Sequence, residues 1–147
     1  MMDEQQLIEK LRLIERLHAG AATDGEREAA ANAKERIRER LRKAGESDPP
    51  VEYQFSLGDP WSRMLMSALL RRYDLKPFRY KRQRRSTIMV RVPGSFVDNT
   101  LWPEFQKLNR TLQDYLAEVT ERVISEGING DSSEIDVFAE GGRQLPG

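Results

Sequence analysis

The chain has no cysteine and a single histidine among its 147 residues. Without cysteine it has no disulfide framework, no thiolate nucleophile and no Cys-based zinc or iron–sulfur site, and one imidazole cannot build a metal cluster. No apolar run approaches the length of about 20 residues that a membrane-spanning helix needs, and the N-terminus lacks the features of a secretory signal. No glycine-rich phosphate loop is present. The sequence therefore predicts a cytoplasmic, non-catalytic protein without metal, cofactor or membrane partner.

The net charge of zero hides a strong asymmetry along the chain. Residues 71–91 contain nine basic residues and one acidic residue, a net charge of +8, whereas residues 95–147 contain four basic and ten acidic residues, a net charge of −6. Such an asymmetry indicates a polyanionic partner, or else two oppositely charged surfaces of one molecule that contact each other. Both interpretations stay open at this point.

The N-terminal third predicts two amphipathic helices. Apolar residues at helical spacing indicate the first helix over residues 5–18, and Gly20 is placed to end it. The apolar residues are Leu7, Ile8, Leu11, Ile14 and Leu17. A capping box from Thr23 to Glu26 begins the second helix, which we expect to reach about Ala44 and to stop at Gly45.

This helical hairpin, residues 5–45, resembles the N-terminal module of the bacterial and phage DUF2786 family. The resemblance rests on the first helix, the link from Thr23 to Glu26 and the alanines Ala29, Ala30 and Ala33. The charged run at residues 34–43 departs from the family's usual pattern. Because the role of that family is unknown, the resemblance implies a helical hairpin before a small α+β unit and supplies no catalytic residue.

Residues 51–126 predict a β-α-β-β-α unit. Strict alternation indicates a strand over residues 51–57, and Asp59 and Pro60 begin a helix that ends near Tyr73. We expect the buried stripe of this helix to contain Trp61, Met64, Leu65, Ala68 and Leu69.

Two further strands and a long helix complete the predicted unit. The strands, residues 77–82 and 86–92, would add to a three-stranded, mainly antiparallel sheet. Ser95 would cap a helix that continues, kinked or interrupted before Pro103, to about Glu126. The expected fold is thus a single α+β domain over residues 1–126, followed by an acidic, mostly disordered tail at residues 127–147.

The first candidate site is the basic hairpin between the last two strands. Alternation would place Arg79 and Lys81 on one face, while Phe78 and Tyr80 face the core, which favours contact with nucleic-acid phosphates without base stacking. The alternatives are a solvated strand edge that prevents aggregation, or an internal dock for the acidic tail. The candidate residues are Arg71, Arg72, Lys76, Arg79, Lys81, Arg82, Arg84, Arg85 and Arg91.

The second candidate is the apolar seam of the long helix, where spacings of three and four residues approximate a heptad. This seam would form a homodimer interface, unless the sheet and the helical hairpin of the same chain cover it. The seam contains Leu101, Phe105, Leu108, Leu112, Tyr115 and Val119.

Catalysis is the third hypothesis. His18 has no second imidazole or thiol to complete a nucleophilic pair, and its place at the end of a helix suggests an interaction with the helix dipole. Carboxylate pairs such as Asp131 with Glu134 lie in solvated contexts. A pocket lined by Trp61, Tyr53 and a buried carboxylate would favour an enzyme.

Overall fold

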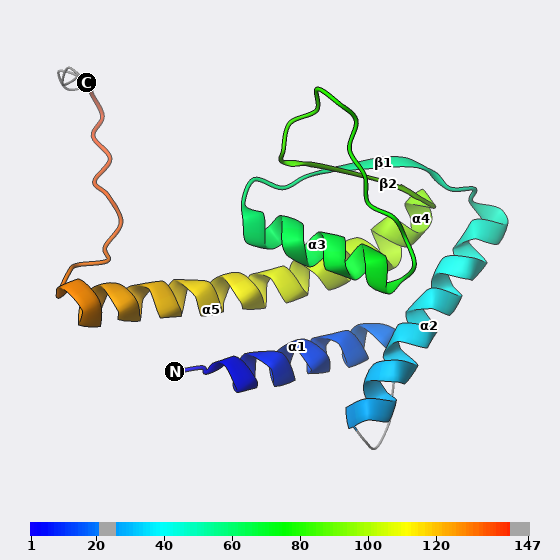
Figure 1. Cartoon of the computed structure of the whole chain (residues 1–147), viewed down its shortest axis with the longest axis horizontal. Coiled ribbons are helices and arrows are strands. Elements are labelled where there is room, and N and C mark those ends of the chain that lie inside the picture. Colours follow the sequence, from blue (N-terminus) through cyan, green and yellow to red (C-terminus); the bar gives the residue numbers. More distant parts are fainter. Residues whose placement is uncertain (21–25, 142–147) are drawn as a thin grey trace. The chain divides into compact units, whose positions relative to one another are not determined.

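The structure is a computed structural model that describes residues 1–20 and 26–141. It confirms the α+β class, an N-terminal pair of helices and a long C-terminal helix (Figure 1). The chain divides into two compact units, Met1–Tyr115 and Leu116–Gly147. None of the helices in the described part of the chain is long and apolar enough to span a bilayer. The elements are, in order, α1 (Glu4–Ala19), α2 (Glu26–Ser47), β1 (Val51–Ser56), α3 (Pro60–Arg72), β2 (Thr87–Val92), α4 (Gly94–Phe96), the π-helical segment η1 (Val97–Leu101) and α5 (Trp102–Ile128).

Helix α1 is closed at both ends by local chemistry. Asp3 and Gln6 form a capping box at its start, and Gly20, with φ 68°, ends it in the left-handed conformation expected from the sequence. Arginines of α2 satisfy carbonyl groups at the same end, because Arg40 donates to His18 and Ala19 at 2.6 and 3.0 Å. Part of the charged run of α2 thus joins the two helices.

Helix α2 is longer than expected and continues through Gly45 to Ser47. The predicted stop at Gly45 is wrong, because Gly45 does not adopt the left-handed conformation with which a glycine commonly ends a helix. The expected capping box from Thr23 to Glu26 lies outside the residues whose side chains are described. Ala33 and Ile37 are fully buried and fix the face of α2 that meets the core.

The sheet has two antiparallel strands rather than the three expected. Strand β1 pairs with β2 in the register Val51↔Val92 to Ser56↔Thr87, and within the described residues the segment 77–82 forms only the bridge Phe78↔Met89. The next ladder bond would join the Tyr80 amide to the Thr87 carbonyl. That carbonyl instead accepts from Arg79 Nε at 2.9 Å, and the Tyr80 amide donates to Gln83 Oε1 at 2.9 Å. Side-chain hydrogen bonds therefore end the ladder after one pair.

The sequence suggested that Phe78 and Tyr80 face the core. The same bridge shows that they do not. Phe78 is opposite Met89, whose face of the sheet points away from the buried residues Ile88 and Val90. Residues 76–86 fold over this outer face, so that Met89 is only 6% exposed, whereas Tyr80 is 49% exposed and donates its hydroxyl proton to Glu52. Arg79, one position away, consequently lies on the side of α3.

Helix α3 begins as expected, with Asp59 as its N-cap and Pro60 in the first turn. Its buried stripe is rotated from the predicted one, because Trp61 and Met64 are 50% and 68% exposed while Met66 and Leu70 are fully buried. A polar network explains the rotation: Ser62 Oγ lies 2.6 Å from Asp59 and 3.0 Å from Asn109 of α5. These bonds turn Ser62 inward and leave Trp61 in solvent.

The last helix begins earlier than expected and contains a wide turn. Pro93 precedes α4, and the backbone amide of Ser95, the expected cap, donates to Asp48 at 2.8 Å. Segment η1 then joins α4 to α5 without interruption. Residues 129–141 contain no helix or strand.

Candidate nucleic-acid interface

Eight of the nine predicted basic residues are exposed, and within the described part of the chain none of these eight forms an ion pair. The exception is Arg72, whose guanidinium pairs with Glu15 and donates to the Ala30 carbonyl at 3.2 Å. Arg72 is therefore half-buried and engaged within its own chain. The exposed residues are Arg71, Lys76, Arg79, Lys81, Arg82, Arg84, Arg85 and Arg91.

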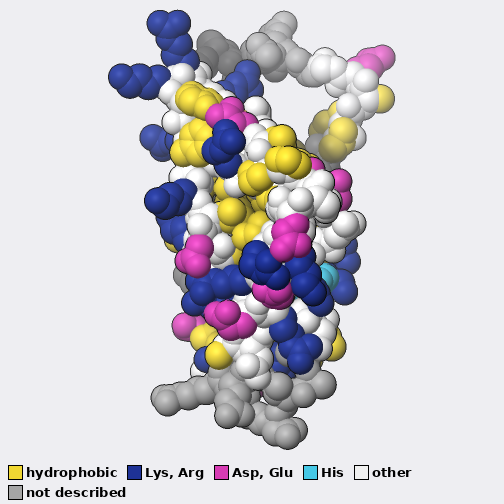
Figure 2. Space-filling view, turned by 90° about the vertical axis from the view of Figure 1, so that its right-hand side faces the viewer, with side chains coloured by type: hydrophobic (Ala, Val, Ile, Leu, Met, Phe, Trp, Pro, Cys, Tyr) yellow, Lys and Arg dark blue, Asp and Glu magenta, His cyan; other side chains and the backbone are white. Residues whose placement is uncertain are grey.

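Most of these cations lie in the loop of residues 76–86, which extends beyond the strand pair (Figure 1). Lys and Arg side chains project from one edge of the surface at the level of this loop (Figure 2). Arg82 holds the left-handed conformation with φ 77°, which a residue with a side chain adopts only at a cost. The loop therefore presents charge at a strained tip.

A surface hollow of about 440 Å³ lies between α3 and this loop, and we name it the arginine groove. It brings together Arg71 and Arg79, both predicted, with Arg63, which the sequence analysis missed. No Asp or Glu is among its lining residues. These are Pro60, Arg63, Met64, Ser67, Arg71, Arg79 and Ile88.

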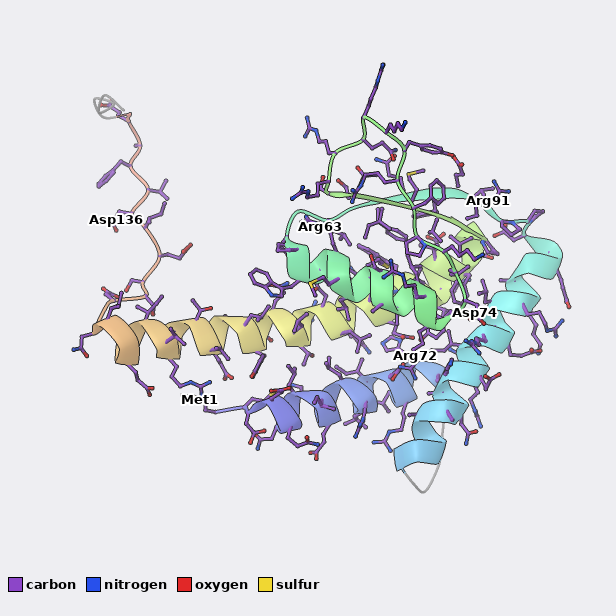
Figure 3. The ribbon with its side chains drawn as sticks, viewed as in Figure 1. Met1, Arg63, Arg72, Asp74, Arg91 and Asp136 are labelled. Carbon is purple, nitrogen blue, oxygen red and sulfur yellow. The ribbon has the colours of Figure 1, made fainter. Side chains whose placement is uncertain are left out.

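The sequence did contain a signal for Arg63. Arg63, Ser67 and Arg71 are spaced by four residues, so they share one face of a helix. Because Arg63 precedes the basic block by eight residues, a count of charge along the chain leaves it out. Arg63 lies near the start of α3, whereas Arg91 lies toward the opposite end of the strand pair and away from the groove (Figure 3).

Two of the three guanidinium groups in the groove are held by backbone carbonyls. Arg63 Nη1 donates to Leu57 and Gly58, at 3.0 Å each. Arg79 donates from Nε to Thr87 at 2.9 Å and from Nη2 to Arg85 at 2.7 Å. Each guanidinium has five N–H donors, so both keep donors for a ligand while their position is fixed.

A polar cluster in the interior was not predicted from the sequence. Glu104 of α5 is 0% exposed and accepts a hydrogen bond of 2.6 Å from the Tyr73 hydroxyl, while its second oxygen has no partner within the described residues. Burial is the main cause that raises the pKa of Glu104 to about 7, and it also raises the pKa values of Tyr73 and of Glu15. The signal was a carboxylate three residues after Leu101 and next to Phe105, a spacing that places it on the same side of the helix as Leu101.

A second cavity, of about 250 Å³, is lined by six apolar side chains of α1, α3 and α5 together with Arg12, Glu15 and Arg72. Glu15 and Arg72 are the paired charges on its wall. The sequence raised the possibility of a catalytic pocket lined by Trp61 and Tyr53. Neither residue lines this cavity or the arginine groove. Within the described residues, no group of three or more metal-ligating side chains is present.

The structure also describes the surroundings of His18 and the burial of the apolar seam of α5. Burial is the main cause that lowers the pKa of His18, with Lys107 and Arg40 contributing, and all three favour the neutral imidazole over the charged form that a helix C-terminus stabilises. In the seam, Leu101, Phe105 and Leu108 are buried in the core of their own chain. Leu112, Tyr115 and Val119 are half-buried.

No protein-family model matches the chain, and no curated protein or solved structure is significantly similar to it. The similarity of the helical pair to the DUF2786 family and the cytoplasmic location therefore stay predictions.

Proposed function

We propose that the protein binds nucleic acid through its phosphates, without reading the base sequence, using the loop of residues 76–86 and the arginine groove. The observation that carries this proposal is the set of eight exposed cations without ion pairs in the described part of the chain. Unpaired arginines and lysines on one surface supply the electrostatic part of nucleic-acid binding, which does not depend on sequence.

The surroundings of the cations favour phosphates over bases. Proteins that bind single strands by stacking present several aromatic faces to the bases. Here Phe78 is half-buried, its ring centroid lies 5.2 Å from that of Tyr80 in an edge-on arrangement, and the Tyr80 hydroxyl is engaged by Glu52. A side chain held in this way offers little stacking surface.

Salt titration tests the proposal. A fluorescein-labelled 20-nucleotide single strand is titrated at several salt concentrations, and log K should fall with log salt by about 0.7 per phosphate contacted. Replacing Arg82, Arg84 and Arg85 together by Glu should abolish most of this dependence. Arg110→Gln, an exposed arginine on α5, is the matched control and should leave the slope unchanged. Failure of the wild-type protein to bind at 20 mM salt would overturn the proposal.

Self-association through α5 is the second candidate. The heptad spacing continues past the core into Leu112, Tyr115, Val119 and Val123, and Val123 is 61% exposed. Sedimentation equilibrium of the wild-type chain beside Val119→Glu tests this candidate. A concentration-dependent dimer that the substitution dissociates is the expected result, and a wild-type monomer at 100 μM would remove it.

A further inference from the structure

The arginine groove differs from the rest of the basic surface in its geometry. Loop cations such as Lys81 and Arg84 are exposed and have no fixed partner among the described residues, so they can follow a polyanion in many arrangements. In the groove, hydrogen bonds to backbone carbonyls fix Arg63 and Arg79 beside Arg71. A fixed set of guanidinium groups binds with less loss of conformational freedom than mobile side chains do.

We propose that the arginine groove is a site for a terminal phosphate monoester of a nucleic-acid strand, an inference that rests on the function proposed above. A phosphate monoester carries a charge of about −1.5 to −2 at pH 7 and has three acceptor oxygens, whereas a phosphodiester within a strand carries a single negative charge. Three arginines around one hollow therefore match the end of a strand better than its interior.

The other polar groups at the groove fit an anion. Ser67 supplies a hydroxyl on the wall between Arg63 and Arg71. Asp59, the acidic residue nearest to the groove in the sequence, is already engaged, because its oxygens accept from the Ser62 amide at 2.8 Å and the Ser62 hydroxyl at 2.6 Å. The groove thus combines three cations and one donor with no carboxylate among its lining residues.

A direct connection joins the groove to the rest of the interface. Arg79 Nη2 donates to the carbonyl of Arg85, a residue of the basic loop, at 2.7 Å. A strand whose end occupies the groove can therefore continue along the loop, where Arg84 and Arg85 meet its phosphodiesters. The groove would give the protein a preference for a phosphorylated strand end. The loop would add affinity for the strand whether or not its end carries a phosphate.

The test compares otherwise identical 12-nucleotide single strands with a 5′-phosphate, a 3′-phosphate or no terminal phosphate, by fluorescence anisotropy at 100 mM salt. At least one phosphorylated strand should bind about tenfold more tightly than the unphosphorylated one, the gain expected for charge-assisted hydrogen bonds to one extra charge. Arg63→Gln and Arg71→Gln should remove this ratio and preserve binding of the unphosphorylated strand. Arg84→Glu with Arg85→Glu should weaken all three strands equally, and Arg110→Gln should change none of them.

Competition separates the strand end from a free phosphate compound. Inorganic phosphate and a nucleoside monophosphate, each at 5 mM, should reduce the ratio only slightly, because they lack the contacts with the loop. If either abolishes it, the site is one for small phosphate compounds and the assignment to a strand end is wrong. Equal binding of all three strands refutes the end preference and leaves the proposed function standing, whereas no binding of any strand at 20 mM salt refutes both.

Discussion

The Tyr73 hydroxyl donates a hydrogen bond of 2.6 Å to Glu104 in a part of the core where both side chains are at most 1% exposed. Tyr73 follows the last residue of α3 and Glu104 lies in the first turn of α5. The bond therefore joins two helices through their interior. Two other charged groups, Glu15 and Arg72, pair on α1 and α3 nearby and also influence the pKa of Glu104.

The stability of the fold should fall as the pH rises through neutrality. Burial, together with Glu15, raises the pKa of Glu104 from its ordinary value of 4.5 to about 7, while the Tyr73 bond and the positive charges of Arg72 and Arg40 lower it. The folded chain thus binds a proton more tightly than the unfolded chain. This contribution is complete below pH 4.5 and is lost as the pH rises through 7, which lowers the free energy of unfolding by about 3 kcal/mol.

Urea denaturation at pH 5, 6, 7 and 8 measures this effect as a difference from Glu104→Gln. The glutamine cannot ionise, so its stability relative to wild type should increase from pH 5 to about pH 7 and level off by pH 8. Glu9→Gln, which changes an exposed glutamate of α1, is the control and should track the wild type. A constant difference between wild type and Glu104→Gln would contradict the pKa shift.

The Glu15–Arg72 pair should behave as a buried ion pair. Arg72→Met leaves the carboxylate of Glu15, which is 7% exposed, without its cation, and should destabilise the chain by about 3 kcal/mol. Adding Glu15→Met should restore most of the loss, since the double variant presents two apolar side chains at an apolar cavity. Thermal and urea unfolding of the three variants at pH 7 measure the coupling.

An exposed pair provides the comparison. Arg42 on α2 pairs with Glu39 at 2.6 Å and both side chains are at least 50% exposed. Arg42→Met should therefore change the free energy of unfolding by less than about 1 kcal/mol. Equal losses for Arg42→Met and Arg72→Met would show that burial does not set the strength of the inner pair.

A substitution of Arg82 should affect nucleic-acid binding without lowering the stability of the fold. Its φ of 77° is strained for arginine and natural for glycine, so Arg82→Gly should leave the free energy of unfolding unchanged or raise it by up to about 1 kcal/mol. The same change removes one exposed cation and should lower the salt slope for a single strand by about 0.7. Loss of stability together with an unchanged slope would mean that Arg82 serves the loop structure rather than a ligand.

The local elements were largely predictable from the sequence because their signals are local. Asp59 and Pro60 begin α3, Gly20 ends α1 and alternation marks β1, and all three features are present. The predictions of secondary structure were wrong where hydrogen bonds outside the regular helix and strand patterns override the local sequence pattern. The third strand ends early because the groups of its next ladder pair bond elsewhere: the Thr87 amide donates to the Arg84 carbonyl at 3.0 Å, and the Tyr80 amide donates to Gln83. The periodicity of the sequence does not reveal these bonds.

The candidate site was predictable in composition but not in geometry. Charge counting found Arg71 and Arg79, but only the crossing of the loop beside α3 joins them to Arg63 in one groove. The basic block also included Arg72, which the structure places in a half-buried ion pair with Glu15. Sequence separation hides such a pair, because its partner, Glu15, lies on another helix.

The π-helical turn at Val97–Leu101 accommodates one more residue than a regular helical turn, and the amide of Trp102 accordingly donates to the Val97 carbonyl. The wide turn therefore takes up one extra residue without changing the side of α5 that faces the interior. Removing the exposed Asn99 would restore regular winding and leave Glu104 facing Tyr73 and Phe105 in the core. The longest helix thus carries one surplus residue at a point where its orientation does not depend on that residue.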